Sequence, residues 1–165
     1  MAGSKKSGAR LTHFDAKGRA RMVDVGAKEI TQREAVAKGS VIVAPATLAR
    51  IQEGTIGKGD VLGVARLAGI MAAKKTPELI PLCHGIALSA VEIELTCDPK
   101  RNAIDVTATC RGNDRTGVEM EAITAVCIAS LTVYDMCKAI DRGIRITDVR
   151  LTKKSGGKSG KYEAK

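Results

Sequence analysis

VEIELTCDPKRNAIDVTATC, residues 91–110, carries the clearest secondary-structure signal in the chain. Apolar and polar side chains alternate strictly along 91–97 and again along 104–110, which is the period of a strand with one buried face. The residues between them, DPKRN, include several that favour turns. The sequence therefore predicts an antiparallel hairpin whose other face is in water.

Helices and further strands are predicted on both sides of this hairpin. In chain order they are strands at 20–25 and 32–43, a short helix that Pro45 opens, a helix at 62–75 that Asp60 caps, a long helix from TGVEME to about Arg142 with Gly143 as its C-cap, and a strand at 144–151. Gly63 and Gly69 would weaken the helix at 62–75 in isolation, so we expect close packing against a neighbour there. This order of elements predicts an α+β fold.

The chain is expected to form one domain with two basic ends. We predict a disordered leader at 1–10, a single catalytic α+β domain at 11–153 and a flexible Gly/Ser/Lys tail at 154–165. No segment approaches the roughly 20 apolar residues of a membrane span, and the start MAGSKKSGAR lacks the apolar core of a secretory signal. We therefore expect a soluble, cytoplasmic protein without membrane contact.

The net charge of +9 is concentrated at the two ends of the chain. Residues 1–21 and 150–165 carry +5 each, whereas the residues between them carry −1. The chain has two Tyr, one Phe and no Trp, so the stacking platforms of single-strand-binding proteins are missing. This distribution favours phosphate-binding ends on a neutral body, and we expect no nucleic-acid partner.

The cysteines and histidines do not predict a metal site or a disulfide framework. Five cysteines is an odd number, none forms a CxxC pair, and the two histidines are far apart in the sequence. We expect most of the cysteines to be small core residues.

The long predicted helix carries an acid and an amine within its most apolar part, EAITAVCIASLTVYDMCKAID. Asp135 and Lys138 are three residues apart and can touch on a helix. One interpretation is an ordinary surface ion pair near the helix C-terminus. The alternative is a pair buried among apolar side chains and placed for proton transfer, in which burial lowers the pKa of Lys138 towards neutrality.

Helix geometry adds a hypothesis about subunits. Glu121 and Asp135 lie within about 40° of the same helix face but roughly 21 Å apart along the axis. One small substrate cannot touch both residues of a single chain. An antiparallel contact between two copies of this helix would place Glu121 of one copy near Asp135 of the other, so we hypothesise an active site shared between subunits.

Other candidate site residues lie in a loop and at a helix start. The loop LIPLCHG presents His84 as a candidate base or hydrogen-bond donor, with a solvated loop histidine as the alternative. No second histidine in a suitable context supports Cys83 as a nucleophile. Glu119 and Glu121 either compensate the helix dipole, or Glu121 binds the amide edge of a guanine-like ring.

Two glycine-containing segments are candidate phosphate sites. KSGGKSG is not a Walker P-loop, because Thr152 stands where the first glycine should be and no helix-length segment follows. It remains a mobile loop that presents Lys154 and Lys158 to phosphates. GKGDV offers Lys58 beside backbone N–H groups as a second anion site.

Together these segments resemble a known family. RMVDV, KGDV, ARLAGI, AAKKT, LIPLCH, TGVEMEA, LTVYDMCKA and VRLTKKSGGKSG follow the order and spacing of the cyclic pyranopterin monophosphate synthase family, from about Leu11 to Gly160. The resemblance implies a ferredoxin-like antiparallel sheet packed against helices, and a homohexamer built as a trimer of dimers with the active site at the dimer interface.

The resemblance also implies a reaction, in molybdenum cofactor biosynthesis. The substrate is (8S)-3′,8-cyclo-7,8-dihydroguanosine 5′-triphosphate, a small-molecule nucleotide made by a radical GTP cyclase. The products are cyclic pyranopterin monophosphate and pyrophosphate, so the enzyme would be a phosphorus–oxygen lyase. We expect no cofactor, because the conversion is a rearrangement with elimination. Mg²⁺ can accompany the triphosphate, although the sequence shows no dedicated cage for it.

Roles for individual residues follow from the same resemblance. Asp135 is the implied catalytic acid, and Lys138 is its neighbouring lysine. The implied substrate contacts are Leu82, Cys83, His84, Glu119, Met120, Glu121 and Lys58, together with Lys154 and Lys158 for the triphosphate. Family members usually have proline after LCH, where this chain has Gly85, so this loop is expected to be less stiff than in the family.

Two other functions compete with this interpretation. A small basic RNA- or nucleotide-binding protein of ferredoxin-like fold fits the charge and the layout, but the predicted sheet strands carry no aromatic residues. A structural assembly protein would use the apolar helix for oligomerisation alone, which leaves Asp135 and Lys138 unexplained.

Overall fold

The computed structural model describes residues 17–158 and 160–164, so the predicted leader at 1–10 lies outside it. Its elements are β1 (Thr31–Ile42), α1 (Pro45–Gln52), α2 (Val61–Lys74), α3 (Thr76–Leu79), β2 (Leu88–Asp98), β3 (Ala103–Asp114), α4 (Glu119–Cys137), β4 (Arg145–Ser155) and β5 (Tyr162–Glu163). The strands form one antiparallel sheet in the order β2-β3-β1-β4-β5. The predicted α+β fold with an antiparallel sheet is confirmed.

The hairpin predicted at 91–110 forms β2 and β3. The inward residues of the two strands face each other: Val91 pairs with Cys110, Ile93 with Ala108 and Leu95 with Val106. Because apolar side chains meet in register, one face of the ladder is apolar and packs into the core.

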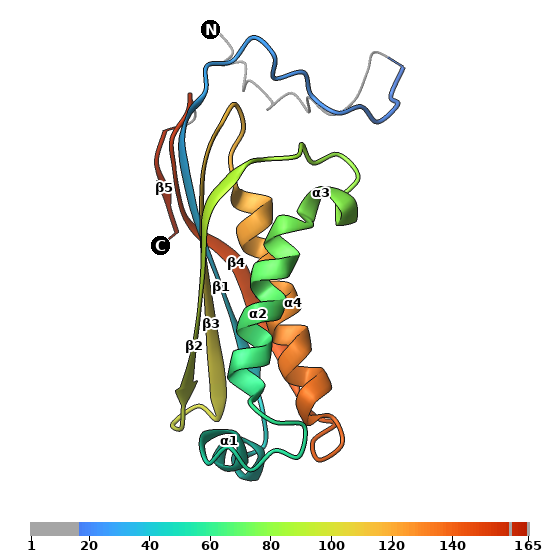
Figure 1. The fold of residues 1–165 in the computed structure, drawn as a ribbon, viewed down its shortest axis with the longest axis vertical. Coiled ribbons are helices and arrows are strands. Elements are labelled where there is room, and N and C mark those ends of the chain that lie inside the picture. Colours follow the sequence, from blue (N-terminus) through green and yellow to red (C-terminus); the bar gives the residue numbers. More distant parts are fainter. Residues whose placement is uncertain (1–16, 159, 165) are drawn as a thin grey trace, which may run out of the picture.

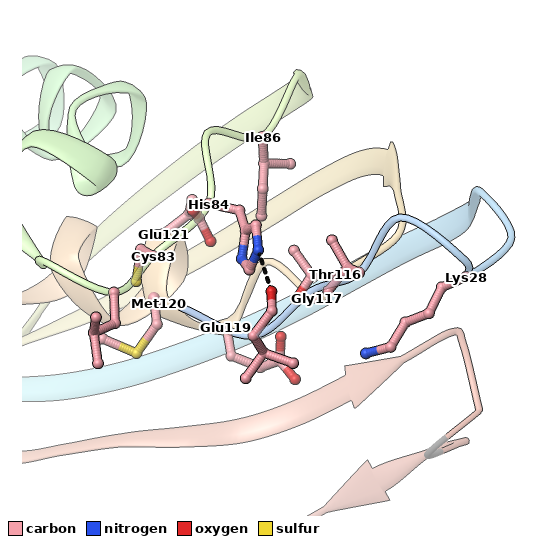
Figure 2. A pocket seen from close by; sticks show the side chains of 12 residues that line it. Lys28, Cys83, His84, Ile86, Thr116, Gly117, Glu119, Met120 and Glu121 are labelled. Atoms are coloured by element: carbon pink, nitrogen blue, oxygen red, sulfur yellow. Dashed lines mark hydrogen bonds between the residues drawn. The ribbon is translucent and has the colours of Figure 1, made fainter. Parts of the chain in front are cut away.

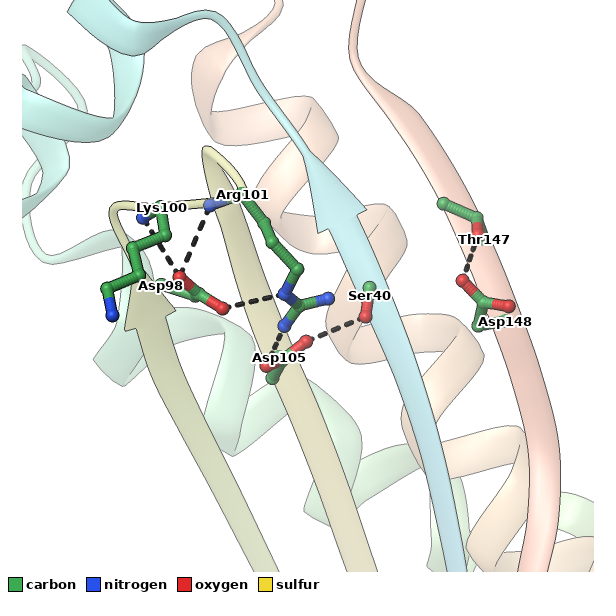
Figure 3. Close-up of polar contacts among 7 residues, drawn as sticks. All are labelled: Ser40, Asp98, Lys100, Arg101, Asp105, Thr147 and Asp148. Carbon is green, nitrogen blue, oxygen red and sulfur yellow. Dashed lines mark hydrogen bonds and ion pairs between the residues drawn. The ribbon is translucent and has the colours of Figure 1, made fainter. Parts of the chain in front are cut away.

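The turn of this hairpin is closed by a polar network on its wet side (Figure 3). Asp98 Oδ1 accepts hydrogen bonds from the backbone N–H groups of Lys100 and Arg101. The guanidinium of Arg101 bonds to the carboxylates of both Asp98 and Asp105. Ser40 Oγ donates to Asp105 Oδ1 at 2.7 Å, which ties the turn to β1.

Helices α2 and α4 lie side by side on one face of the sheet (Figure 1). The predicted close packing occurs at Gly69, where an added Cβ would lie 3.1 Å from the backbone O of Ala125 and 3.3 Å from the Cβ of Ala129. At Gly63 the close neighbour is instead Asp60, whose side chain caps α2 by accepting from the Gly63 N–H at 2.9 Å. Of the two glycines, only Gly69 therefore allows the close approach of α2 to α4.

Helix α4 supplies much of the core. By length and composition it is the one helix among the described residues that could cross a membrane, but 56% of its apolar window is buried inside the protein. Ala125, Val126, Ala129 and Val133 have no exposed surface. Packing against α2 and the sheet therefore accounts for its apolar character.

One predicted strand and the ends of two predicted elements were wrong. Residues 20–25 do not form a strand, and the carbonyl of Val23 accepts a hydrogen bond from the His84 ring instead of from a neighbouring strand. Helix α4 ends at Cys137 with Lys138 as its C-cap, five residues before Arg142. Strand β4 continues beyond residue 151 to Ser155, because β1 and β5 provide partners for it on both sides.

Candidate functional site

One pocket brings together the six substrate contacts expected from LIPLCH and TGVEME. This pocket, the Glu121 pocket, has a volume of about 300 Å³ and lies between the segments 23–28, 82–86 and 116–121 (Figure 2). Its lining includes the following predicted residues: Leu82, Cys83, His84, Glu119, Met120 and Glu121. Residues about 35 positions apart in the sequence meet here because the loop before β2 passes over the start of α4.

Glu121 is the most unusual group in this pocket. Its side chain is 2% exposed, and its Oε2 has no hydrogen-bond partner among the described residues. Burial raises the pKa of its carboxyl to about 7, and the negative charges of Glu119 and Asp114 act in the same direction. A buried polar atom without a partner is costly, so its position in a pocket marks a place where a ligand can bond to it.

His84 has a defined orientation in the same pocket (Figure 2). Its Nε2 lies 2.8 Å from the carbonyl O of Val23. Because a carbonyl only accepts, Nε2 carries the hydrogen and Nδ1 of the neutral ring is left as an acceptor. The adjacent Cys83 has its thiol pKa raised by burial and then by the charge of Glu121, which disfavours the reactive thiolate.

A second, larger cavity adjoins the Glu121 pocket. It has a volume of about 940 Å³ and shares Lys28, Thr116, Gly117 and Glu119 with that pocket. Five basic side chains line it, and we call it the basic cavity: Lys28, Arg33, Arg115, Lys154 and Lys158. The two acidic residues in its lining are Glu29 and Glu119. This excess of positive charge suits a polyphosphate.

The first part of KSGGKSG, residues 154–158, lies against β1 at the edge of the basic cavity. Gly156 and Gly157 have φ angles of +100° and +67°. An added Cβ at Gly156 would lie 2.1 Å from the backbone O of Gln32, and one at Gly157 would lie 1.7 Å from Nη1 of Arg33. Glycine is therefore required at both positions, and part of the predicted flexible tail has a defined place.

Three of the basic residues were missed by sequence reasoning. Arg33 lies inside β1 and donates to the backbone O atoms of Asp114 and Arg115, both at 3.1 Å. Nothing in its local sequence distinguishes it from any other charged strand residue. Arg115 and Lys28 could have been suspected, because Arg115 directly precedes TGVEME and Lys28 closely follows RMVDV.

The remaining predicted residues form a separate group, the Asp135 cluster (Lys58, Asp135 and Lys138). Asp135 Oδ1 lies 2.8 Å from Nζ of Lys138, and its Oδ2 lies 3.0 Å from Nζ of Lys58. Lys58 Nζ also donates to the backbone O of Asp135 at 2.8 Å. Lys58 of the GKGDV loop thus contacts the C-terminal end of α4. The sequence did not predict this contact between Lys58 and Asp135.

The predicted burial of the Asp135 cluster was wrong for the single chain. The Asp135 side chain is 54% exposed, because it lies on the outer face of the last turn of α4. Hydrogen bonds from Lys138 and then Lys58 lower the pKa of Asp135, whereas the bond to Asp135 raises the pKa of Lys138. The lysine pKa therefore shifts away from neutrality, which is opposite to the predicted direction.

The two groups lie at opposite ends of α4. Glu121 is in its first turn and Asp135 in its last, so they are roughly 21 Å apart along the helix axis. A single chain therefore does not bring the Asp135 cluster to the Glu121 pocket. Gly85, the departure from the family pattern, is exposed, and an added Cβ there would meet no atom within 4 Å.

Comparison with known proteins gives close relatives along almost the whole chain. A Rhodospirillum rubrum protein named cyclic pyranopterin monophosphate synthase is 62% identical over 154 residues, covering 93% of each chain. Proteins with the same name from Chloroflexus aurantiacus and Pelotomaculum thermopropionicum are 59% and 57% identical, over 93% and 94% of this chain and 94% and 91% of their own.

The family comparison agrees with these relatives. The sequence model of the MoaC family matches residues 22–157, which include the Glu121 pocket, the Asp135 cluster and the lining of the basic cavity except Lys158. The resemblance expected from RMVDV, TGVEMEA, YDMCK and KSGGKSG is confirmed. This chain belongs to the MoaC family.

Proposed function

We propose that this chain is a cyclic pyranopterin monophosphate synthase, acting on (8S)-3′,8-cyclo-7,8-dihydroguanosine 5′-triphosphate. Its relatives of that name cover more than nine tenths of it. The observation that carries the proposal is the pair of joined cavities, in which an unpartnered buried carboxyl beside His84 adjoins five basic side chains. The first cavity suits the polar edge of a guanine-derived ring, and the second suits a triphosphate.

We assign the proton transfers of ring opening and pyranopterin closure to Asp135 and Lys138, with His84 of a second chain nearby in the assembled site. In the free single chain the cluster is a carboxylate between two ammonium groups. Exclusion of water on assembly and substrate binding would raise the energy of these charges, which would oppose the upward shift of the Lys138 pKa and move it towards values useful for proton transfer. Lys58 donates to the same carboxylate and would keep it oriented.

The last step of the proposed reaction releases pyrophosphate. A ribose-derived hydroxyl oxygen bonds to the α-phosphorus, and the bond from that phosphorus to the pyrophosphate oxygen breaks. The electron pair leaves with pyrophosphate, and a base of the site takes the hydroxyl proton. Lys154 and Lys158 would neutralise the growing charge on the leaving group. This elimination would make the enzyme a phosphorus–oxygen lyase.

The proposed reaction needs no redox cofactor, because its atoms rearrange without net oxidation. Mg²⁺ bound to the triphosphate is compatible with it. Among the described residues there is no group of three or more His, Cys, Asp and Glu side chains that could hold a metal ion. The cyclised substrate would come from a radical GTP cyclase, in the cytoplasm.

We further propose that two chains share each active site. Helices α2 and α4 expose large apolar side chains that an ordinary solvated face would not carry: Val64, Leu67, Met71, Met120 and Leu131. An antiparallel contact through this face would bring the Asp135 cluster of one chain to the Glu121 pocket of the other. Three such dimers would form the proposed homohexamer.

The test is turnover of the cyclised nucleotide, followed by pyrophosphate release and by mass spectrometry of the pterin product. Asp135→Asn and Lys138→Ala should each abolish turnover in a folded, oligomeric protein. Asp148→Asn, which removes an exposed acid from β4, serves as the matched control and should remain active. Normal product formation by the Asp135 or Lys138 variant would show that the pair is structural. Salt-dependent RNA retention without turnover would instead favour the RNA-binding alternative.

A further inference from the structure

An ion pair stands at the boundary between the two cavities. Lys154 Nζ lies 2.8 Å from Oε1 of Glu119, and both side chains are 26% exposed. Glu119 lines both the Glu121 pocket and the basic cavity, whereas Lys154 lines the basic cavity. The pair therefore lies where the ring of a nucleotide would join its phosphates.

Both partners are held by regular secondary structure. Lys154 lies in β4, paired with Ala35 of β1 on one side and with Tyr162 of β5 on the other. Glu119 is the first residue of α4. The sheet and the helix fix the backbone positions of both residues. The ion pair therefore has a more defined geometry in the free chain than a pair of long side chains on a flexible surface would have.

A carboxylate and a phosphate compete for the same kind of donor. The ammonium group of Lys154 has three N–H donors, and both anions accept charge-assisted hydrogen bonds from it. A polyphosphate in the basic cavity would therefore have to displace the Glu119 carboxylate from Lys154, or share the ammonium with it at the cost of like-charge repulsion. Because a quarter of each side chain is still exposed, a displaced Glu119 can turn towards water.

We propose that Glu119 is a placeholder for the polyphosphate, pairing with Lys154 when the cavity is empty and weakening the retention of pyrophosphate. The contact keeps Lys154 aimed into the cavity before substrate arrives. After the reaction it competes with the product for the same ammonium, and so favours product release. The inference rests on the proposed function only in taking the basic cavity as the triphosphate site.

The test measures the Kd of inorganic pyrophosphate by titration calorimetry, at low ionic strength, for wild type and Glu119→Gln. The variant should bind pyrophosphate about fivefold more tightly, since it loses one competing charge-assisted contact. Glu119→Asp, which keeps the charge but shortens the reach, should also bind more tightly. Glu29→Gln is the matched control: Glu29 is an exposed acid of the same cavity, and its replacement should change Kd less than twofold.

The Lys154→Met background separates competition from general electrostatics. Lys154→Met alone should weaken pyrophosphate binding, and adding Glu119→Gln to it should give no further gain. An unchanged Kd in Glu119→Gln, an equal gain in Glu29→Gln, or an undiminished gain in the Lys154→Met background would each overturn the placeholder. A lack of pyrophosphate binding by both wild type and Glu119→Gln would overturn it as well.

Turnover of the cyclised nucleotide by the same wild-type preparation tests the proposed function separately. An active wild type with no effect of Glu119→Gln on Kd would refute the placeholder alone. An inactive wild type in which Glu119→Gln binds pyrophosphate fivefold more tightly would refute the proposed reaction while supporting the placeholder.

Discussion

Mixing two inactive variants should restore activity if the site is shared between chains. Co-expression of Asp135→Asn chains with Glu121→Gln chains tests this, because the two residues lie at opposite ends of α4. In an antiparallel dimer, each site takes Asp135 from one chain and Glu121 from the other. A hybrid dimer therefore contains one site with both native residues and one site with both substitutions.

The expected recovery follows from this geometry. Random association makes half of the dimers hybrid, and one of the two sites in each hybrid is intact, so the mixture should regain about a quarter of wild-type turnover. The separation of roughly 21 Å between Glu121 and Asp135 excludes a site that holds both residues of one chain around a small substrate. The assay is pyrophosphate release from the cyclised nucleotide, normalised to the proportion of each chain determined by mass spectrometry.

A second mixture provides the control. Asp135→Asn and Lys138→Ala affect residues 2.8 Å apart in the same chain, so no hybrid of these two contains an intact cluster. This mixture should stay inactive. The reasoning is refuted if the first mixture stays inactive although hybrids form, or if both mixtures recover equally.

Three further predictions concern substrate binding and stability. Lys154→Ala combined with Lys158→Ala should chiefly raise KM for the cyclised nucleotide, because both side chains would bind its phosphates; an unchanged KM would remove their phosphate role. Since the pKa of Glu121 is raised from 4.5 to about 7, the unfolded state loses the proton first as pH rises, so stability falls across that range. Urea unfolding should show wild type losing ~3 kcal/mol relative to Glu121→Gln between pH 4.5 and 7.5, and parallel pH profiles would contradict this. Gly69→Leu should destabilise by about 2 kcal/mol or more by overpacking the contact of α2 with α4, whereas Gly57→Leu, in open space, should unfold like wild type.

Local patterns were sufficient for the elements that make local contacts. The β2–β3 hairpin was predicted because strict alternation, a short connection and inward apolar pairing are all encoded within 91–110. The Asp60 cap and the Pro45 start of α1 were predicted for the same reason. Residues 20–25 form no strand beyond an isolated bridge at Ala20, and their pattern is weaker, because Met22 and Val23 are consecutive apolar residues that break the alternation.

The candidate site depended on contacts that no local pattern contains. Lys58 meets Asp135 across 77 residues, and Arg33 bonds to the carbonyl of Asp114 across 81. The family motifs identified Lys58 and Asp135 as site residues but did not predict that the two side chains touch. No motif identified Arg33. In the single chain Asp135 is exposed, because the apolar residues around it in the sequence leave one stripe of α4 uncovered, with Cys127, Leu131 and Asp135 along it; its burial in a subunit contact stays a prediction.

Glu121 and Asp135 of α4 have opposite electrostatic environments, which would give the proposed shared site a proton donor and a proton acceptor. Glu121 is buried without a cation, which raises its pKa to about 7, whereas Asp135 is held by two ammonium groups that lower its pKa. A pair with separated pKa values can supply a proton from one member and accept a proton at the other at the same pH. On one chain these carboxyls are too far apart to act on one substrate. The proposed two-fold contact through α4 would bring a proton donor and a proton acceptor to the same nucleotide, and it would cover Met120 and Leu131, the large apolar side chains that α4 exposes in the single chain.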